Sequence, residues 1–153
     1  MSAVIRDPAF VERFDPEIAK ALRKYTKEGG GYPALLGLVV EEVTPGRIVV
    51  ALPVRPELCS VVGVVHGGAF ASLVDHALSL VVYPLVERGK WVATTEFKIN
   101  YLESVREGTL RVTAEVVSLR ARLAVARAEV ECGGKLVAHA QGTLYVREPA
   151  NSK

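Results

Sequence analysis

The chain has 153 residues, of which 50% are hydrophobic and 24% are charged, a composition that fits one globular domain and excludes a disordered protein. A formal net charge of +2 gives no reason to expect a nucleic-acid partner. No apolar run reaches the ~18 residues of a membrane span without an ionisable residue inside it, so we expect no membrane partner. Residues 1–14 carry several charges and no apolar signal core, which predicts a cytoplasmic protein.

Metal and serine-hydrolase chemistry find no support in the sequence. Cys59 and Cys132 are too few for a disulfide framework and lack zinc-ligand spacing, so we expect reduced thiols. His66, His76 and His139 also lack metal-ligand spacing. No Gly-x-Ser-x-Gly motif is present. We therefore expect no metal and no cofactor, and the scarcity of Met, Gln and Asn hints at a thermophilic source.

The N-terminal residues predict a short helical segment. Asp7 and Asp15 each precede a proline, which is the arrangement of an N-cap residue before the first helical position. Apolar residues follow Pro16 at helical spacing, and the glycines at 29–31 predict a helix stop and a loop. We divide the chain into an N-terminal helical segment (1–31), one domain (32–148) and a C-terminal tail (149–153).

The domain is expected to combine six strands with one long helix. The apolar stretch 69–86 is rich in Ala and Leu and predicts a helix of four to five turns. A helix that is apolar nearly all round must be covered, so we expect an α+β fold in which a curved antiparallel sheet wraps around it. Exposed sheet surface then favours pairing with another copy. The expected strands are 36–43, 47–54, 91–103, 109–119, 123–132 and 135–147.

Asp75 is the residue in this helix that most suggests chemistry. A carboxylate in an apolar helix is costly unless it is used or satisfied. Its neighbours three and four positions away are Ala71, Ser72, Leu78 and Ser79, mostly small residues that leave room beside it. A structural acid or an interface ion pair explains Asp75 equally well from composition alone. The opposite face is expected to be core and consists of Phe70, Leu73, Val74 and Ala77.

The tripeptide His66-Gly67-Gly68 stands where the helix begins. Glycines there leave backbone N–H groups accessible, and the helix dipole favours negative charge at that end. An oxyanion site needs these two properties, although a loop glycine before a helix looks the same.

Taken together, these residues resemble a known family. Ser60-x-x-Gly63-x-x-His66-Gly67-Gly68, Leu73-x-Asp75 and the run Thr94 to Leu102 resemble the hotdog-fold acyl-CoA thioesterases of the phenylacetate-degradation type. The resemblance extends over roughly residues 37–147. It implies the hotdog fold, an acyl-CoA substrate, and hydrolysis of the thioester to a free acid and CoA.

The resemblance also implies roles for single residues. Asp75 matches the catalytic carboxylate, acting as nucleophile or as general base on water, and Gly67 matches the glycine whose N–H polarises the thioester carbonyl. Thr94 matches a hydroxyl that holds the water or the carboxylate. By the period of two we place Thr94 on one strand face with Glu96, Lys98 and Asn100.

Other matches concern substrate binding. His66 and Gly68 match the turn that shapes the substrate loop, whereas Ser60 stands where many members have Asn. Arg120 and Arg122 lie in a turn where the family places basic residues near the CoA nucleotide, and a solvated hairpin tip is an equally good interpretation.

Helix geometry adds an expectation about assembly. Gly67 and Asp75 are eight residues apart, about 12 Å along one helix, so they cannot reach the same carbonyl carbon. A site that uses both must combine two chains. We therefore expect at least a homodimer, and the family suggests a homotetramer with shared sites.

Two other functions fit the same fold. One is a non-catalytic acyl-CoA binding or sensing protein, although such a regulator needs a partner domain for which this chain has no room. The other is a hydratase or dehydratase, which the pattern around His66 does not suit. Aryl and aliphatic acyl groups are both compatible with a pocket formed by Tyr32, Leu35, Leu58 and Phe70.

Overall fold

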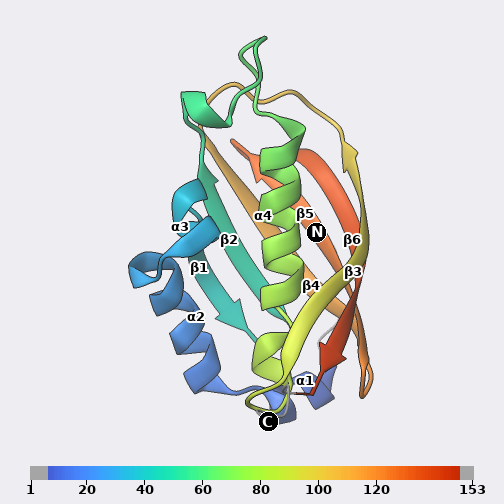
Figure 1. Ribbon diagram of the computed structural model, residues 1–153. Helices are drawn as coiled ribbons and strands as arrows, with labels where there is room; N and C mark the ends of the chain where they lie inside the picture. Colours follow the sequence, from blue (N-terminus) through green and yellow to red (C-terminus); the bar gives the residue numbers. More distant parts are fainter. Residues whose placement is uncertain (1–6, 149–153) are drawn as a thin grey trace.

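The computed structural model of the protein describes residues 7–148, so the expected tail and the first six residues lie outside the described part. One six-stranded antiparallel sheet curves around a central helix, α4, as expected (Figure 1). The strand order is β1-β2-β4-β5-β6-β3. The helices are α1 (Pro8–Arg13), α2 (Pro16–Glu28), α3 (Gly31–Leu36), α4 (Gly67–Leu80) and the 3₁₀ turns η1 (Pro56–Leu58) and η2 (Tyr83–Leu85). The strands are β1 (Val39–Thr44), β2 (Arg47–Pro53), β3 (Trp91–Tyr101), β4 (Thr109–Leu119), β5 (Leu123–Cys132) and β6 (Lys135–Arg147).

The core lies between α4 and the concave face of the sheet. The expected core face of the helix is confirmed, since Phe70, Leu73, Val74 and Ala77 are all buried. They pack in one cluster with the inward residues of the strands. The stretch Gly67–Leu85 is long and apolar enough to cross a membrane, but 61% of it is buried inside this fold. Its apolar character is therefore that of a core helix.

The N-terminal segment belongs to the same core. The Asp7 and Asp15 carboxylates accept hydrogen bonds from N–H groups in the first turns of α1 and α2, which confirms both expected N-caps. Helix α2 ends at Glu28 as expected and contacts β1, and Phe10 and Ala19 join the core cluster.

The glycine run does not lead into a loop, contrary to expectation. Gly31 begins α3, and Gly37 ends it in the left-handed conformation (φ 77°) with its N–H bonded to the Pro33 and Ala34 carbonyls. Strand β1 therefore starts at Val39 rather than at 36. Six residues are too few to give a readable helical period, which is why the pattern concealed α3.

The central helix is shorter and shifted relative to the expected 69–86. It starts at Gly67, with His66 as its N-cap, and its α-helical part ends at Leu80. Pro84 has no N–H to donate to the carbonyl four residues earlier, so the chain tightens there into η2.

Strands β4, β5 and β6 have the expected bounds, whereas β3 ends at Tyr101 and carries a bulge. On β6, Leu144 faces Thr94 and Thr143 faces Glu96, so Thr95 is the extra residue. The bulge shifts the alternation by one. Thr94 therefore shares the inward face with Phe97 and Ile99, and its expected grouping with Glu96, Lys98 and Asn100 was wrong.

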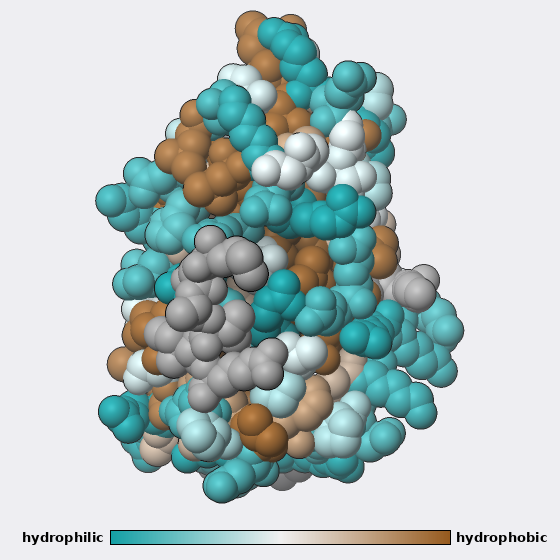
Figure 2. All heavy atoms as spheres, turned by 180° about the vertical axis from the view of Figure 1, so that it is seen from behind, coloured by the Kyte–Doolittle hydropathy of each residue, from teal (hydrophilic) through white to brown (hydrophobic). Residues whose placement is uncertain are grey.

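The sheet leaves one edge uncovered. Strand β1 is flanked by α2, but β3 pairs only with β6 among the described strands. Seen from behind, the outer face of the sheet is largely hydrophilic (Figure 2). Charged pairs such as Arg127–Glu115, with an N–O distance of 2.7 Å, lie on the central strands.

Candidate active site

The first turn of α4 presents one unused backbone donor. The Gly68 N–H donates to His66 Nδ1 at 2.9 Å, and the Ala69 and Phe70 N–H groups donate to the His66 carbonyl. The Gly67 N–H has no acceptor among the described residues. It stands at the positive end of the helix dipole and is partly exposed, which are the properties required of an oxyanion donor.

Close contacts leave little room for a side chain at either glycine of this turn. A Cβ at Gly67 would lie 3.3 Å from the Tyr101 ring and hydroxyl. A Cβ at Gly68 would lie 2.9 Å from His66 Nδ1, too close for the capping geometry. Neither glycine has a positive φ, so the reason for glycine here is space rather than backbone conformation.

Asp75 lies two turns farther along α4 and is half-buried. Its Oδ1 is buried and has no hydrogen-bond partner among the described residues. The two serines on its stripe are used elsewhere, because Ser72 Oγ donates to the Gly68 carbonyl and Ser79 Oγ to the His76 carbonyl. Within one described chain Asp75 is therefore not a satisfied structural acid, and it is available to a substrate, a water molecule or a second chain.

His76 follows Asp75 on α4 and is half-buried. Burial lowers the pKa of the His76 imidazole, and the neighbouring Asp75 charge partly opposes this shift by raising it. Its Nε2 is buried with no hydrogen-bond partner in the described chain. Because the net shift of the His76 pKa is downward, the imidazole next to Asp75 is neutral at pH 7.

Ser60 lies in the loop that leads into α4. The Cys59–Val65 bridge closes this loop, with the Ser60 N–H donating to the Val64 carbonyl and the His66 N–H donating to the Leu58 carbonyl. The Ser60 hydroxyl is buried without a partner among the described residues and borders a surface pocket of about 470 Å³. Ser60 thus lies in the loop before α4, and its hydroxyl forms no hydrogen bond to the Gly67 turn within the described residues.

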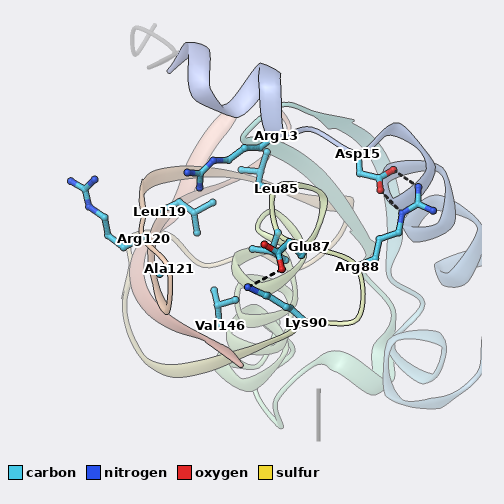
Figure 3. A pocket seen from close by; sticks show the side chains of 11 residues that line it. Arg13, Asp15, Leu85, Glu87, Arg88, Lys90, Leu119, Arg120, Ala121 and Val146 are labelled. Carbon is cyan, nitrogen blue, oxygen red and sulfur yellow. Dashed lines mark hydrogen bonds and ion pairs between the residues drawn. The ribbon is translucent and has the colours of Figure 1, made fainter. Parts of the chain in front are cut away.

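Thr94, Arg120 and Arg122 lie apart from the glycine turn. Thr94 faces the concave side of the sheet, and no hydrogen bond joins its hydroxyl to Asp75 within the described residues. Arg120 borders a pocket of about 600 Å³ at the opposite end of α4, beside Leu85 (Figure 3). Its side chain extends away from the pocket centre. Arg122 is exposed in the same turn.

The sequence pattern missed three hydroxyl groups around the glycine turn. Tyr101 donates to the Gly67 carbonyl at 3.1 Å, and Ser72 Oγ lies 2.7 Å from the Tyr32 hydroxyl. Tyr101 belongs to the motif quoted above, where its alternation with Phe97 and Ile99 signals an inward position. Tyr32 and Ser72 are 40 residues apart, and no local pattern links them.

No group of three or more His, Cys, Asp or Glu residues within 7–148 is arranged to hold a metal ion. Both cysteines are free thiols, as expected. The chemistry available at α4 therefore consists of a carboxylate, backbone N–H groups and hydroxyls.

Comparison with known proteins agrees with this chemistry. A family profile described as "Thioesterase superfamily" matches residues 62–139, about half of the chain and the whole of α4. A Saccharolobus solfataricus protein that carries an esterase name is 33% identical over 77% of this chain and 79% of its own length. The chain belongs to the thioesterase superfamily. Human acyl-coenzyme A thioesterase 13 is 26% identical over 85% of this chain and 92% of its own length.

The fold of this superfamily member is also that of solved relatives. A thioesterase structure from Haemophilus influenzae superposes with a TM-score of 0.80, at 23% identity, over 88% of this chain and 93% of that one. The hotdog fold expected from the motifs is thus confirmed. As a superfamily member the protein is a thioester hydrolase.

Proposed function

We propose that the protein hydrolyses acyl-CoA thioesters, with Asp75 and Gly67 as the catalytic pair. The observation that carries this proposal is the buried, unpartnered Oδ1 of Asp75 on a helix that also presents a free N–H at Gly67. Relatives named as an acyl-CoA thioesterase and as a 1,4-dihydroxy-2-naphthoyl-CoA hydrolase support a CoA ester as substrate.

In the proposed mechanism the Asp75 carboxylate activates or provides the nucleophile, and the Gly67 N–H stabilises the developing oxyanion. Asp75 removes a proton from the attacking water, or attacks the carbonyl itself to form an anhydride that water then opens. The Gly67 N–H donates to the carbonyl oxygen as negative charge develops there. The carbon–sulfur bond breaks and the thiolate of CoA leaves. Thr94 and Ser60 supply hydroxyls that hold the water or the carboxylate.

The CoA moiety is assigned to basic and glycine-turn residues. His66 and Gly68 shape the loop beside the thioester, and Arg120 and Arg122 attract the phosphates of the nucleotide. The pocket beside Arg120 is also lined by Arg13, Arg88 and Lys90 against Asp15 and Glu87, an excess of positive charge that supports this assignment.

The assembly follows from the separation of the two catalytic groups. Gly67 and Asp75 both lie on α4, about 12 Å apart along its axis, so one chain cannot place both at one carbonyl. A homodimer joined along the free β3 edge supplies the second group, and a homotetramer is built from two such dimers. We propose a cytoplasmic enzyme, and the composition suggests a thermophilic one.

A thiol-release assay with a panel of aryl- and alkyl-CoA esters tests the function. Asp75→Asn keeps the side-chain shape and loses basicity and nucleophilicity, so kcat should fall by about 10³-fold with an unchanged melting temperature. The exposed carboxylate variant Glu131→Gln, on the outer face of the sheet, is the matched control and should retain full turnover. Near wild-type activity of a folded Asp75→Asn enzyme would contradict the proposal.

A further inference from the structure

We propose that three hydroxyl side chains, Tyr101, Ser72 and Tyr32, form a brace that positions the first turn of α4 for catalysis. The inference rests on the proposed role of the Gly67 N–H as oxyanion donor. The three act on the turn and not on the substrate, so they are positioning residues.

The turn needs support because it begins with two glycines. Gly67 and Gly68 have no side chains to pack, and glycine has the largest conformational freedom of any residue. An oxyanion donor, in contrast, must be held within about 0.5 Å of its productive position. The His66 cap restrains Gly68 through its N–H. Each glycine carbonyl accepts the helix hydrogen bond from the residue four positions later, and its second lone pair leaves room for one further partner.

Tyr101 supplies the first partner from the end of β3. Its hydroxyl donates to the Gly67 carbonyl at 3.1 Å. Its ring stands edge-on to Phe70, with centroids 5.8 Å apart and planes at 77°, which fixes the phenol against the buried side of the same turn. The ring also occupies the space above Gly67, since a Cβ there would lie 3.3 Å from it.

Ser72 supplies the further partner of the Gly68 carbonyl, and Tyr32 in turn bonds to Ser72. Ser72 Oγ donates to the Gly68 carbonyl at 2.8 Å and so spends its only hydrogen. The Tyr32 hydroxyl, 2.7 Å from the same Oγ, must therefore be the donor of that pair. The hydrogen bonds run from Tyr32 to Ser72 to Gly68, so Tyr32 acts only through Ser72.

The far end of this chain of hydrogen bonds is itself fixed. Tyr32 belongs to α3, whose terminal carbonyls at Leu35 and Leu36 accept bonds of 2.6 and 2.5 Å from the Arg55 guanidinium. Tyr32 is 59% exposed, so its hydroxyl can be removed without opening the core. The brace thus connects α3 to the turn that carries Gly67.

Three variants test the brace on the intact enzyme. Tyr101→Phe and Ser72→Ala should each lower kcat about 10-fold with KM within about twofold, because a misplaced group costs rate while binding remains. Tyr32→Phe should cost less. Added to Ser72→Ala, it should cost nothing more, since Tyr32 has no other route to the turn. Tyr25→Phe, a tyrosine 53% exposed on α2, is the matched control and should match the wild type.

Amide hydrogen exchange gives a readout that does not depend on turnover. Exchange at Gly68, Ala69 and Phe70 should accelerate in Tyr101→Phe and Ser72→Ala and stay unchanged in Tyr25→Phe. Unchanged kcat, a change in KM alone, or additive losses in the Tyr32–Ser72 double variant would overturn the brace. If the wild type releases no thiol from any CoA ester, the proposed function fails, and exchange at the turn alone then decides the brace.

Discussion

His76 gives the site a pH-sensitive neighbour. Its lowered pKa means that the unfolded chain takes up a proton near pH 6.5 while the folded protein does not. The stability contributed by the neutral imidazole is therefore complete above pH 6.5 and is lost as pH falls through the lower pKa of the folded state. Between these two pKa values, one such proton makes the free energy of unfolding fall by up to about 1.4 kcal/mol for each pH unit of acidification.

Urea unfolding between pH 7 and pH 5 measures this effect. His76→Gln should flatten the dependence of the unfolding free energy on pH, whereas His139→Gln, at an exposed position on β6, should keep the wild-type slope. Equal slopes in the wild type and His76→Gln would show that the His76 imidazole is not the responsible group.

Single residues differ in how far the sequence alone can assign them. Asp75 stands out because a carboxylate in an apolar helix is improbable without a use, and Gly67 because a glycine pair at a helix start exposes donors. Tyr32 carries no such signal, since its importance comes from a contact with a residue 40 positions away. Ser60 could be placed in the loop before α4, but its unpartnered hydroxyl became evident only from burial.

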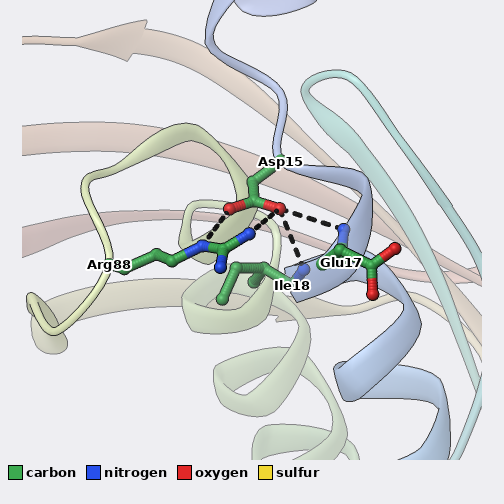
Figure 4. Close-up of polar contacts among 4 residues, drawn as sticks. All are labelled: Asp15, Glu17, Ile18 and Arg88. Atoms are coloured by element: carbon green, nitrogen blue, oxygen red, sulfur yellow. Dashed lines mark hydrogen bonds and ion pairs between the residues drawn. The ribbon is translucent and has the colours of Figure 1, made fainter.

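At the scale of elements, one carboxylate joins α2 to the segment after η2. Asp15 accepts from the N–H groups of Glu17 and Ile18 and from Arg88 Nε at 2.6 Å and Nη2 at 3.1 Å (Figure 4). The Arg88 hydrogen bond is the main cause that holds the pKa of the Asp15 carboxyl below its usual value. The stabilisation by the Asp15–Arg88 contact is therefore present above about pH 4. It is lost as pH falls through the lowered pKa of Asp15.

Asp15→Asn separates helix capping from ion pairing, because Asn caps a helix as well as Asp but has no charge and only one acceptor oxygen for the Arg88 guanidinium. We expect a lower melting temperature at pH 7 and a smaller loss on acidification below pH 4. Asp7→Asn, at the cap of α1 where the carboxylate accepts an N–H and pairs with no guanidinium among residues 7–148, should change little by comparison. If Asp15→Asn and Asp7→Asn have equal melting temperatures, the contact between Asp15 and Arg88 does not stabilise the fold.

Long elements were readable from the sequence and short irregular ones were not. Strands β4 to β6 have their expected bounds because alternation over ten or more residues is unambiguous. The bulge at Thr95 breaks that regularity by a single residue and reverses the face of every later side chain on β3. Pro84 predicts that the helix ends near it, but the α-helix already ends at Leu80, and no sequence signal marks that residue.

For the whole molecule, the free edge of β3 and the separated catalytic groups lead to the same expectation. An 11-residue edge strand invites pairing, and its Tyr101 already touches the turn of Gly67. Pairing of two β3 edges would bring the α4 helices of both chains to one interface. The Gly67 N–H of one chain could then serve the Asp75 of the other.

Mixing two inactive variants tests whether the site is shared. One is Asp75→Asn, and the other is Gly67→Val, whose side chain collides with the Tyr101 ring and displaces the donor. In a heterodimer one site combines an intact Gly67 turn with an intact Asp75, while the other site carries both lesions. Activity should therefore return on subunit exchange, up to about half the wild-type rate per heterodimer if the sites are independent.

The control mixes two preparations of the same variant, each treated identically, and these should stay inactive. Native mass spectrometry of differently tagged chains reports how many heterodimers form, and circular dichroism reports that both variants fold. A site confined to one chain predicts no recovery, because each chain keeps its own defect. Folded heterodimers without activity would contradict a site shared between two chains. Gly67 could then not act on the same thioester carbonyl as Asp75, because the two lie too far apart on one helix.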